Sequence, residues 1–524
     1  MTMESRKGKV IPFAQSATFY MKRGARDMER NDILGALHRY RLAQQAAPDE
    51  AAPTLALAEI LSYMQRYEES NRLILQLMAR GVGTPECHFG LACNYFGMRE
   101  YDYAVESLEN YLDSDPDGPF AADAEDFLDL LDDDLAMLEI AGLMSDADYD
   151  ANAACVYARH LMDAGDFAAA VSLLKSECQH APDSVMLKNQ LTMAYFCGGE
   201  RGKAAGVVQE LMDSGRDDIL TRCNYALLCL ARNERQEADA AIDGLLKSDT
   251  ESPEALHGIA VLLVETDRYS DALNILERLM RIVPYDEQVL HMLGYCRYRL
   301  KDFSGAQSCY KRLLRIDPED TIAKYYLSES RVTDADERRM RSHWVVQYQV
   351  PFQEAFKRLA QINRSLLLPE AEQRERWKND RHFVDLLRWA LTLPDVRVKK
   401  SILSLLYLFK DERAEAMLRD FLLRPEQPDE QKRMVFGMLK DMGAQEPYMA
   451  YLNGRWLQGR VNFLQFSYPL PTPYEAIIGL LLEDMGGMRD QRCLTAAAGI
   501  YKRYIESLHQ KFPRITSMQA AALV

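Results

Sequence analysis

A pattern of thirty-four residues recurs along this chain and constrains its fold more than any other feature. Residues 85–116, 253–284 and 287–318 each carry a small residue within a first apolar stretch, then a polar turn, a second small residue and a closing proline. Starting points fall at 17, 51, 85 and 119 and, after a slip of two residues, at 151, 185, 219, 253, 287 and 321. A fixed period of this length predicts a stack of similar helical hairpins that bury their apolar faces against each other.

The small residues occupy equivalent places in each unit, where helices must come close together. Ala92, Ala260 and Gly294 lie in the first predicted helix of their units, and Ala104, Ala272 and Ala306 lie in the second. Small side chains let two backbones approach, and bulkier residues such as Tyr40 and Tyr310 fill the remaining gaps. The spacing therefore encodes packing rather than chemistry.

These residues resemble the signature of the tetratricopeptide repeat, a helix-turn-helix unit of the same length. The resemblance implies an all-α fold: a right-handed superhelical solenoid over residues 17–332, followed by a C-terminal α-helical region. Residues 1–16 are expected to form an N-terminal tail. Residues 117–150 are a degenerate acidic repeat that permits one long helix, and 321–332 are expected to form a capping helix.

The period breaks after residue 333, and the charge changes sign. Residues 1–330 carry a net charge of −22, whereas 331–524 carry +6. We expect a helical connector over 333–393 and, at 394–450, helical pairs that look weakly like HEAT repeats, with Pro394 and Pro428 thirty-four residues apart. Residues 451–524 are expected to be mostly helical after a short strand or extended arm.

In the family that the pattern resembles, the first helix of each unit lines the concave side of the superhelix, where peptides bind. The residues that the register sends inward are Phe89, Phe96, Arg159, Met162, Asn189, Met193, Phe196, His257, His291, Tyr295, Tyr298 and Tyr325. Such a groove is apolar and aromatic with a few polar points, and it suits an amphipathic helix or an extended apolar peptide. The alternative is that these side chains only pack against neighbouring helices.

The sequence carries no recognisable catalytic or cofactor signature. Residues 198–203 (GGERGK) lack the remaining residues of a phosphate-binding loop, and the dinucleotide and His-Glu-x-x-His patterns are missing. His257 and His291 alone are too few for a closed metal site. We therefore expect no enzyme activity, no cofactor and no metal. The lack of a long apolar run and the spacing of the ten cysteines favour a cytosolic protein with reduced thiols and no membrane contact.

Charge suggests the kinds of partner. Between Arg99 and Arg159 there are eighteen acidic residues and no Lys or Arg, which indicates either a solvated helix face or, over residues 100–150, a docking surface for a basic segment. We expect a scaffold or adaptor that binds a protein or peptide in the concave groove. The alternative is a regulatory sensor whose C-terminal region contacts nucleic acid, although nucleic acid is an improbable partner at a net charge of −16. The basic residues for that alternative are Arg388, Arg397, Lys399, Lys400, Lys432 and Arg433.

Overall fold

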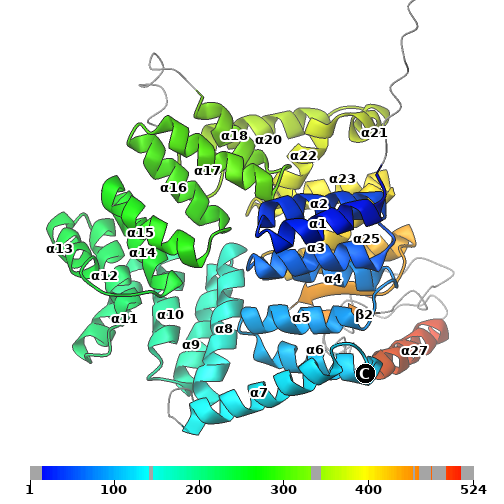
Figure 1. The fold of residues 1–524 in the computed structure, drawn as a ribbon, viewed down its shortest axis with the longest axis horizontal. Helices are drawn as coiled ribbons and strands as arrows, with labels where there is room; N and C mark the ends of the chain where they lie inside the picture. The colour runs from blue at the N-terminus through cyan, green and yellow to red at the C-terminus, as the bar shows by residue number, and fades with distance from the viewer. Residues whose placement is uncertain are drawn as a thin grey trace, which may run out of the picture.

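The computed structural model describes residues 15–140, 146–331, 344–452, 455–459, 474 and 491–508. Consecutive antiparallel helices stack side by side over the first three fifths of the chain (Figure 1). These helices are α1 (Ala17–Glu29), α2 (Ile33–Ala46), α3 (Ala51–Tyr63), α4 (Tyr67–Ala79), α5 (Glu86–Gly97), α6 (Tyr101–Ser114), α7 (Ala121–Ile140), α8 (Asp146–Asp163), α9 (Phe167–His180), α10 (Val185–Cys197), α11 (Arg201–Asp213), α12 (Ile219–Ala231), α13 (Arg235–Leu245), α14 (Pro253–Glu265), α15 (Tyr269–Ile282), α16 (Glu287–Arg299), α17 (Phe303–Ile316) and α18 (Thr321–Glu329). The all-α solenoid predicted from the period is confirmed.

The first helices of the units start within two residues of the places that the period predicts, except α8, which begins five residues early at Asp146. The degenerate slot holds the single long helix α7, and its last residues already belong to α8. The turn between the two helices of a unit also repeats, because one residue there has a positive φ. These residues are Asn31, Gln65, Arg99, Gly165, Gly199, Asn233, Asp267 and Lys301. Their spacing is thirty-four residues throughout, apart from the slip across α7.

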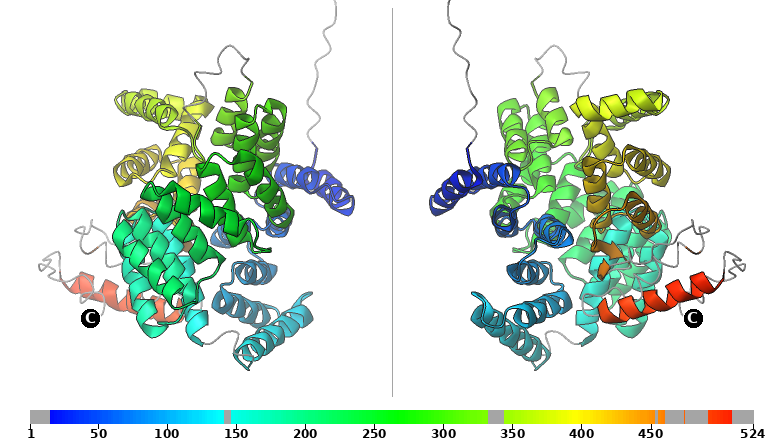
Figure 2. Two further views of the ribbon diagram at one scale, coloured as in Figure 1. Left: turned by 90° about the vertical axis from the view of Figure 1, so that its left-hand side faces the viewer. Right: turned by 90° about the vertical axis from the view of Figure 1, so that its right-hand side faces the viewer.

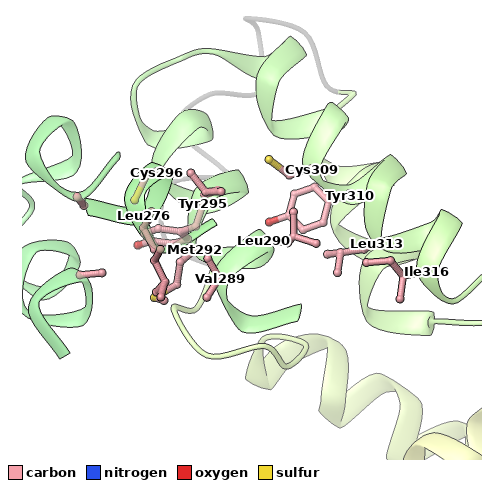
Figure 3. Close-up of a cluster of buried hydrophobic side chains, with 14 of the residues drawn as sticks. Leu276, Val289, Leu290, Met292, Tyr295, Cys296, Cys309, Tyr310, Leu313 and Ile316 are labelled. Carbon is pink, nitrogen blue, oxygen red and sulfur yellow. The ribbon is translucent and has the colours of Figure 1, made fainter. Parts of the chain in front are cut away.

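The small residues form the predicted close contacts. Ala92, Ala104 and Ala272 are completely buried. Gly294 faces the ring of Tyr310, and a methyl group at Gly294 would lie only 3.0 Å from that ring. Figure 3 shows Tyr310 among apolar side chains of α15, α16 and α17. Alanine and glycine therefore set the distance between helices, and the tyrosine fills the space that they leave.

The superhelix turns far enough for its beginning to meet its end. In Figure 1, α1 and α2 lie beside α17, and α2 contacts α17 directly. The Arg66 guanidinium lies 2.6 Å from a carboxylate oxygen of Glu287, and Arg41 donates a hydrogen bond to the Ile316 carbonyl. Arg315 forms a further ion pair with Asp32 at 3.3 Å. The arch is consequently closed by polar contacts between its first two units and its last, together with apolar residues of α2 and α3 that share one buried cluster with α14–α17.

The C-terminal region begins with residues 344–350, which form neither helix nor strand, and continues as a helical layer. Its elements are α20 (Phe352–Leu366), α21 (Glu370–Asn379), α22 (Arg381–Leu391), α23 (Val396–Phe409), α24 (Glu412–Leu422), α25 (Asp429–Met442), the hairpin β1 (Tyr448–Leu452) and β2 (Arg455–Gly459), and α27 (Gln491–Ser507). The hairpin is antiparallel, with Tyr448 opposite Gly459 and Leu452 opposite Arg455. It begins three residues before the short strand or arm expected from residue 451.

This layer has a core of its own and also packs against the solenoid. Trp377 is 1% exposed, and its ring stacks on Phe409 at 4.8 Å between centroids. Helix α24 and strand β1 contact α4, so the chain returns to its second unit (Figure 2). Among the described residues, no helix combines the length and the apolar character that crossing a membrane requires.

Candidate functional site

The segment 344–350, called the strap below, lies against α16 and α18 and bends at residues 346–349. The Gln288 side chain binds the strap backbone twice: its amide donates to the Val346 carbonyl at 3.0 Å, and its oxygen accepts from the Tyr348 N–H at 2.7 Å. The Tyr326 hydroxyl donates to the Gln349 carbonyl at 2.8 Å. A side-chain amide that pairs with both a carbonyl and an N–H is suited to holding an extended backbone.

Trp344 anchors the strap in a box of aromatic rings. Its indole stacks on Tyr298 with 3.9 Å between centroids and 8° between planes. Tyr326 and Tyr310 approach it edge-on at 4.8 and 5.8 Å. Trp344 is only 8% exposed. Stacked and edge-to-face rings of this size contribute much of the binding energy at protein contacts, so this box is the strongest ligand-holding feature of α16–α18.

The prediction that His291, Tyr295 and Tyr298 line an open groove is therefore wrong in this respect. Their exposed fractions are 0%, 5% and 6%. The strap covers them, and the thirty-four-residue period carries no signal for a segment that lies outside the repeats. Replacing Tyr295 and Tyr298 by alanine would remove part of the core and would not report on partner capture alone.

His291 has a structural role inside this contact. Burial lowers its pKa to about 4, so the ring is neutral at physiological pH. Its Nε2 lies 2.9 Å from the Val345 carbonyl, and its Nδ1 lies 3.2 Å from the Tyr310 hydroxyl. A neutral ring with its proton on Nε2 satisfies both contacts. Both nitrogens are thus engaged, which leaves neither free for a metal shared with His257.

The other predicted groove residues divide into packed and open ones. Asn189 is 5% exposed, receives a hydrogen bond from Thr221 at 3.0 Å and donates one to Asp218 at 2.9 Å, so it joins neighbouring units. Phe89 stacks on Phe120.

Tyr325 packs against the apolar cores of the solenoid and of the C-terminal layer, and Phe96, 38% exposed, contacts Phe127 edge-on. The remaining residues, Arg159, Met162, Met193, Phe196 and His257, are exposed or half-buried. We call these five the open stripe.

The hairpin makes a second contact between the C-terminal layer and the solenoid, which the sequence did not predict. The Tyr451 hydroxyl lies 3.2 Å from Nδ1 of His160 on α8, and Trp456 packs near Tyr95 on α5. The buried Lys432 ammonium donates to the Tyr451 carbonyl at 2.6 Å. The continuous apolar run at 448–452 is consistent with a buried strand, but it does not indicate which surface the strand covers.

Glu100 lies beneath this hairpin in an environment that disfavours its charge. Burial raises its pKa to about 7, with opposing contributions from His160, which favours the carboxylate, and Glu68, which disfavours it. The carboxyl group is therefore partly protonated near neutral pH. Because the pKa of the folded protein exceeds the unfolded value, stability is lost as the pH rises from about 4.5 to about 7.

The variant Glu100→Gln should remove this pH dependence. We expect its free energy of unfolding to exceed that of the wild type by roughly 1 to 3 kcal/mol at pH 8, since the amide has no charge to desolvate. At pH 4.5 the two proteins should be nearly equal. Urea unfolding at both pH values measures the difference, with Asp113→Asn on the exposed side of α6 as the control. An equal difference at both pH values would show that the charge of Glu100 is not the cause.

A cavity of about 870 Å³ lies where α4, α16–α18, the strap and helices α20–α24 meet. Its charged lining comprises Arg66, Arg72, Arg388, Arg413 and Arg424 and the acids Glu69, Glu287, Asp317, Glu319, Asp320, Asp385 and Asp420. Ion pairs link Arg66 to Glu69 and Glu287, Arg72 and Arg424 to Asp420, and Arg388 to Glu319. These ion pairs join α4, the last units of the solenoid and the C-terminal layer. The walls of the cavity are therefore where the arch and the C-terminal layer are held together.

Several basic residues considered for nucleic-acid contacts are not available for phosphate. Lys399 and Lys432 are 2% and 0% exposed, and burial lowers the pKa of each to about 8. Arg388 pairs with Glu319 at 2.6 Å. Helices α23 and α25 thus place the two lysines in the interior, where they cannot contact phosphate.

Stacked helical hairpins, with a repeating positive-φ turn and small residues at the helix contacts, define the class of the fold: a solenoid of tetratricopeptide-type helical repeats. A family model described as "Tetratricopeptide repeat" matches residues 263–328. The TPR repeat-containing protein YvcD of Bacillus subtilis (strain 168) is 28% identical over 220 residues, which cover 41% of this chain and 44% of YvcD. The match thus spans less than half the length of that relative.

Solved structures with a similar arrangement of helices include the APC/C hetero-tetramer Cut9-Hcn1 and yeast Tom70. The first has a TM-score of 0.31 and 12% identity and covers 60% of this chain and 55% of the other. The second has a TM-score of 0.28 and 13% identity and covers 81% and 92%. The repeats support a role in protein-protein interaction in general terms.

Proposed function

We propose that this protein is a non-catalytic scaffold that holds an extended apolar segment of a partner protein on the open stripe of α8, α10 and α14. The observation that carries the proposal is the strap. On α16 the strap covers His291, Tyr295 and Tyr298, and the thirty-four-residue register places Asn189, Met193 and Phe196 at the equivalent positions of α10.

The chemistry of the open stripe fits such a partner. Met162, Met193 and Phe196 offer adaptable apolar surface, and Arg159 and His257 add polar points at its ends. Burial lowers the pKa of His257, so its ring adds a hydrogen-bonding group without a charge.

Two further features belong to this proposal. Exposed acidic residues on α6 and α7, among them Asp113, Asp123 and Asp126, provide a place where a basic part of the same partner can dock. We also propose a cytosolic location, as the cysteine pattern suggests; six of the cysteines are buried within the fold as free thiols. We do not propose the nucleic-acid alternative, because Lys399 and Lys432, two of its six basic residues, are buried and Arg388 pairs with Glu319.

Selection of peptides on the full chain tests the proposal. Peptides from a random display library are selected on the wild type, and their affinities are measured by fluorescence polarisation. We expect the double variant Met193→Ala, Phe196→Ala to bind them at least about tenfold more weakly, because it loses two apolar anchors. The matched control is Lys175→Ala with Gln209→Ala on the exposed faces of α9 and α11.

The control variant should bind like the wild type, and circular dichroism should show equal helicity for all three proteins. If the selected peptides bind the double variant as tightly as they bind the wild type, the binding site lies outside the open stripe. A selection that yields no binding peptide would count against groove binding altogether.

A further inference from the structure

The strap contacts the solenoid in the manner of a bound peptide rather than of a packed loop. Its buried side chains, Trp344 and Val350, lie at its two ends; Val345, Val346 and Tyr348 are half-buried, and Gln347 and Gln349 are exposed. Between these ends the backbone bends at residues 346–349, where the Gln349 N–H donates to the Gln347 carbonyl at 2.8 Å. Val346 and Tyr348 pack against the same apolar cluster as Trp344.

Main-chain atoms of the strap supply most of its hydrogen bonds. Gln288 pairs with the Val346 carbonyl and the Tyr348 N–H, and the Val345 and Gln349 carbonyls contact His291 and Tyr326. Such bonds form with any sequence in an extended conformation. Selectivity therefore comes from the pocket for Trp344 and from Asp320, which accepts a hydrogen bond from the Tyr348 hydroxyl.

One feature of the strap makes it an imperfect ligand. The indole Nε1 of Trp344 is buried and has no hydrogen-bond partner among the described residues. Burying an unpaired donor destabilises the seated strap. A competing segment that presents a ring without this donor avoids the cost.

We propose that the groove of α16–α18 is a peptide site that the strap occupies as an internal ligand. A partner protein displaces the strap with a segment that carries a large aromatic residue, a β-branched residue and a tyrosine at the positions of Trp344, Val346 and Tyr348. The site is separate from the open stripe on α8–α14, so the two proposals can fail independently.

Displacement of the strap has a consequence for the rest of the molecule. Tyr348, Gln349 and Val350 line the charged cavity, and α20 follows directly at Phe352. A partner that removes the strap also removes one wall of that cavity. Binding at this groove is therefore coupled to the contact between the arch and the C-terminal layer.

The test uses a fluorescent peptide with the sequence of residues 344–350, WVVQYQV. It is titrated into the full-length wild type and into the variant Trp344→Ala, Tyr348→Ala, whose strap lacks its two anchors. We expect micromolar binding to the variant and at least tenfold weaker binding to the wild type. The reason is that a tethered ligand competes at a local concentration on the order of millimolar. The control peptide AVVQAQV should bind neither protein.

Adding Gln288→Ala to the variant Trp344→Ala, Tyr348→Ala should weaken peptide binding at least fivefold. The reason is that the Gln288 side chain can no longer pair with a carbonyl and an N–H of the bound backbone. Circular dichroism verifies that each variant is folded. The proposal would be overturned if the folded variant Trp344→Ala, Tyr348→Ala did not bind WVVQYQV, or if the wild type bound this peptide as tightly as the variant does.

A second measurement does not depend on any variant. Hydrogen exchange of residues 344–350 is followed in the wild type with and without millimolar WVVQYQV. Displacement predicts faster exchange of the amide protons in the strap when the peptide is present, and no change with AVVQAQV. Unchanged exchange with WVVQYQV at millimolar concentration would contradict an exchangeable internal ligand.

Discussion

Replacing Tyr310 by alanine is expected to lower the free energy of unfolding by roughly 3 to 5 kcal/mol, the usual cost of removing a large buried aromatic side chain. Tyr310 is completely buried, and its ring fills the space opposite Gly294. It also stacks with Tyr326 at 5.4 Å and lies edge-on to Trp344. Its removal opens a cavity beneath both the last unit and the strap. Urea unfolding monitored by circular dichroism measures the loss.

The variant Tyr310→Phe separates packing from hydrogen bonding at this position. It keeps the ring and removes only the contact with Nδ1 of His291, so we expect a loss of about 1 kcal/mol. If Tyr310→Phe were as damaging as Tyr310→Ala, the hydroxyl contact would dominate, and the role assigned to the ring would be incorrect. A stable Tyr310→Ala protein would show that the helices can close the gap opposite Gly294.

Local features of the fold were predictable because they repeat. Each helical hairpin depends on contacts within a unit and with the next unit, and the sequence records them as small residues at fixed intervals. Ala92, Ala104 and Ala272 are buried as this reasoning requires. The long helix α7 was also foreseeable, since residues 119–150 lack a turn signal.

Long-range features were not predictable from the same signal. The closure of the arch joins Arg66 to Glu287 and Asp32 to Arg315, pairs that are more than two hundred residues apart. A repeat pattern specifies the relation between neighbouring units, and small rotations per unit accumulate to decide whether the two ends meet. Single charged residues near the turns give no indication of such distant partners.

The candidate site likewise has local features that the sequence predicts and long-range features that it does not. The register places His291, Tyr295 and Tyr298 on one face of α16, and all three belong to the contact with the strap. It did not reveal that this face is filled by residues 344–350. The run WVVQYQV alternates apolar and polar residues only in its second half, and the neighbouring helical patterns suggested a helical connector. Tertiary contacts with Gln288 and Tyr298 hold it in a bent, non-helical conformation instead.

Replacing Arg66 by methionine should open the closure of the arch. Arg66 lies between Glu69 on its own helix and Glu287 on α16, at 2.6 Å from each. Without the guanidinium, two acidic side chains face each other in the cavity. We expect a loss of about 2 to 4 kcal/mol at pH 8, somewhat below the value for a fully buried pair because these side chains are 18% to 35% exposed.

The loss should depend on pH in a defined direction. Burial already raises the pKa of Glu287, and removal of Arg66 raises it further in the folded state. An acid with a raised folded pKa costs stability as the pH increases, so the variant should be damaged less at pH 5 than at pH 8. Urea unfolding at the two pH values measures this effect, and small-angle X-ray scattering reports whether the particle expands.

A double-mutant cycle assigns the effect to the contact between the two ends of the arch. If Arg66 and Glu287 act together, Glu287→Gln should restore part of the stability lost in Arg66→Met, whereas independent sites would give additive losses. Arg222→Met, which removes an exposed ion pair with Asp217, should change stability by less than about 1 kcal/mol. Additive losses with an unchanged particle size would mean that the apolar contacts of α2 and α3 close the arch on their own.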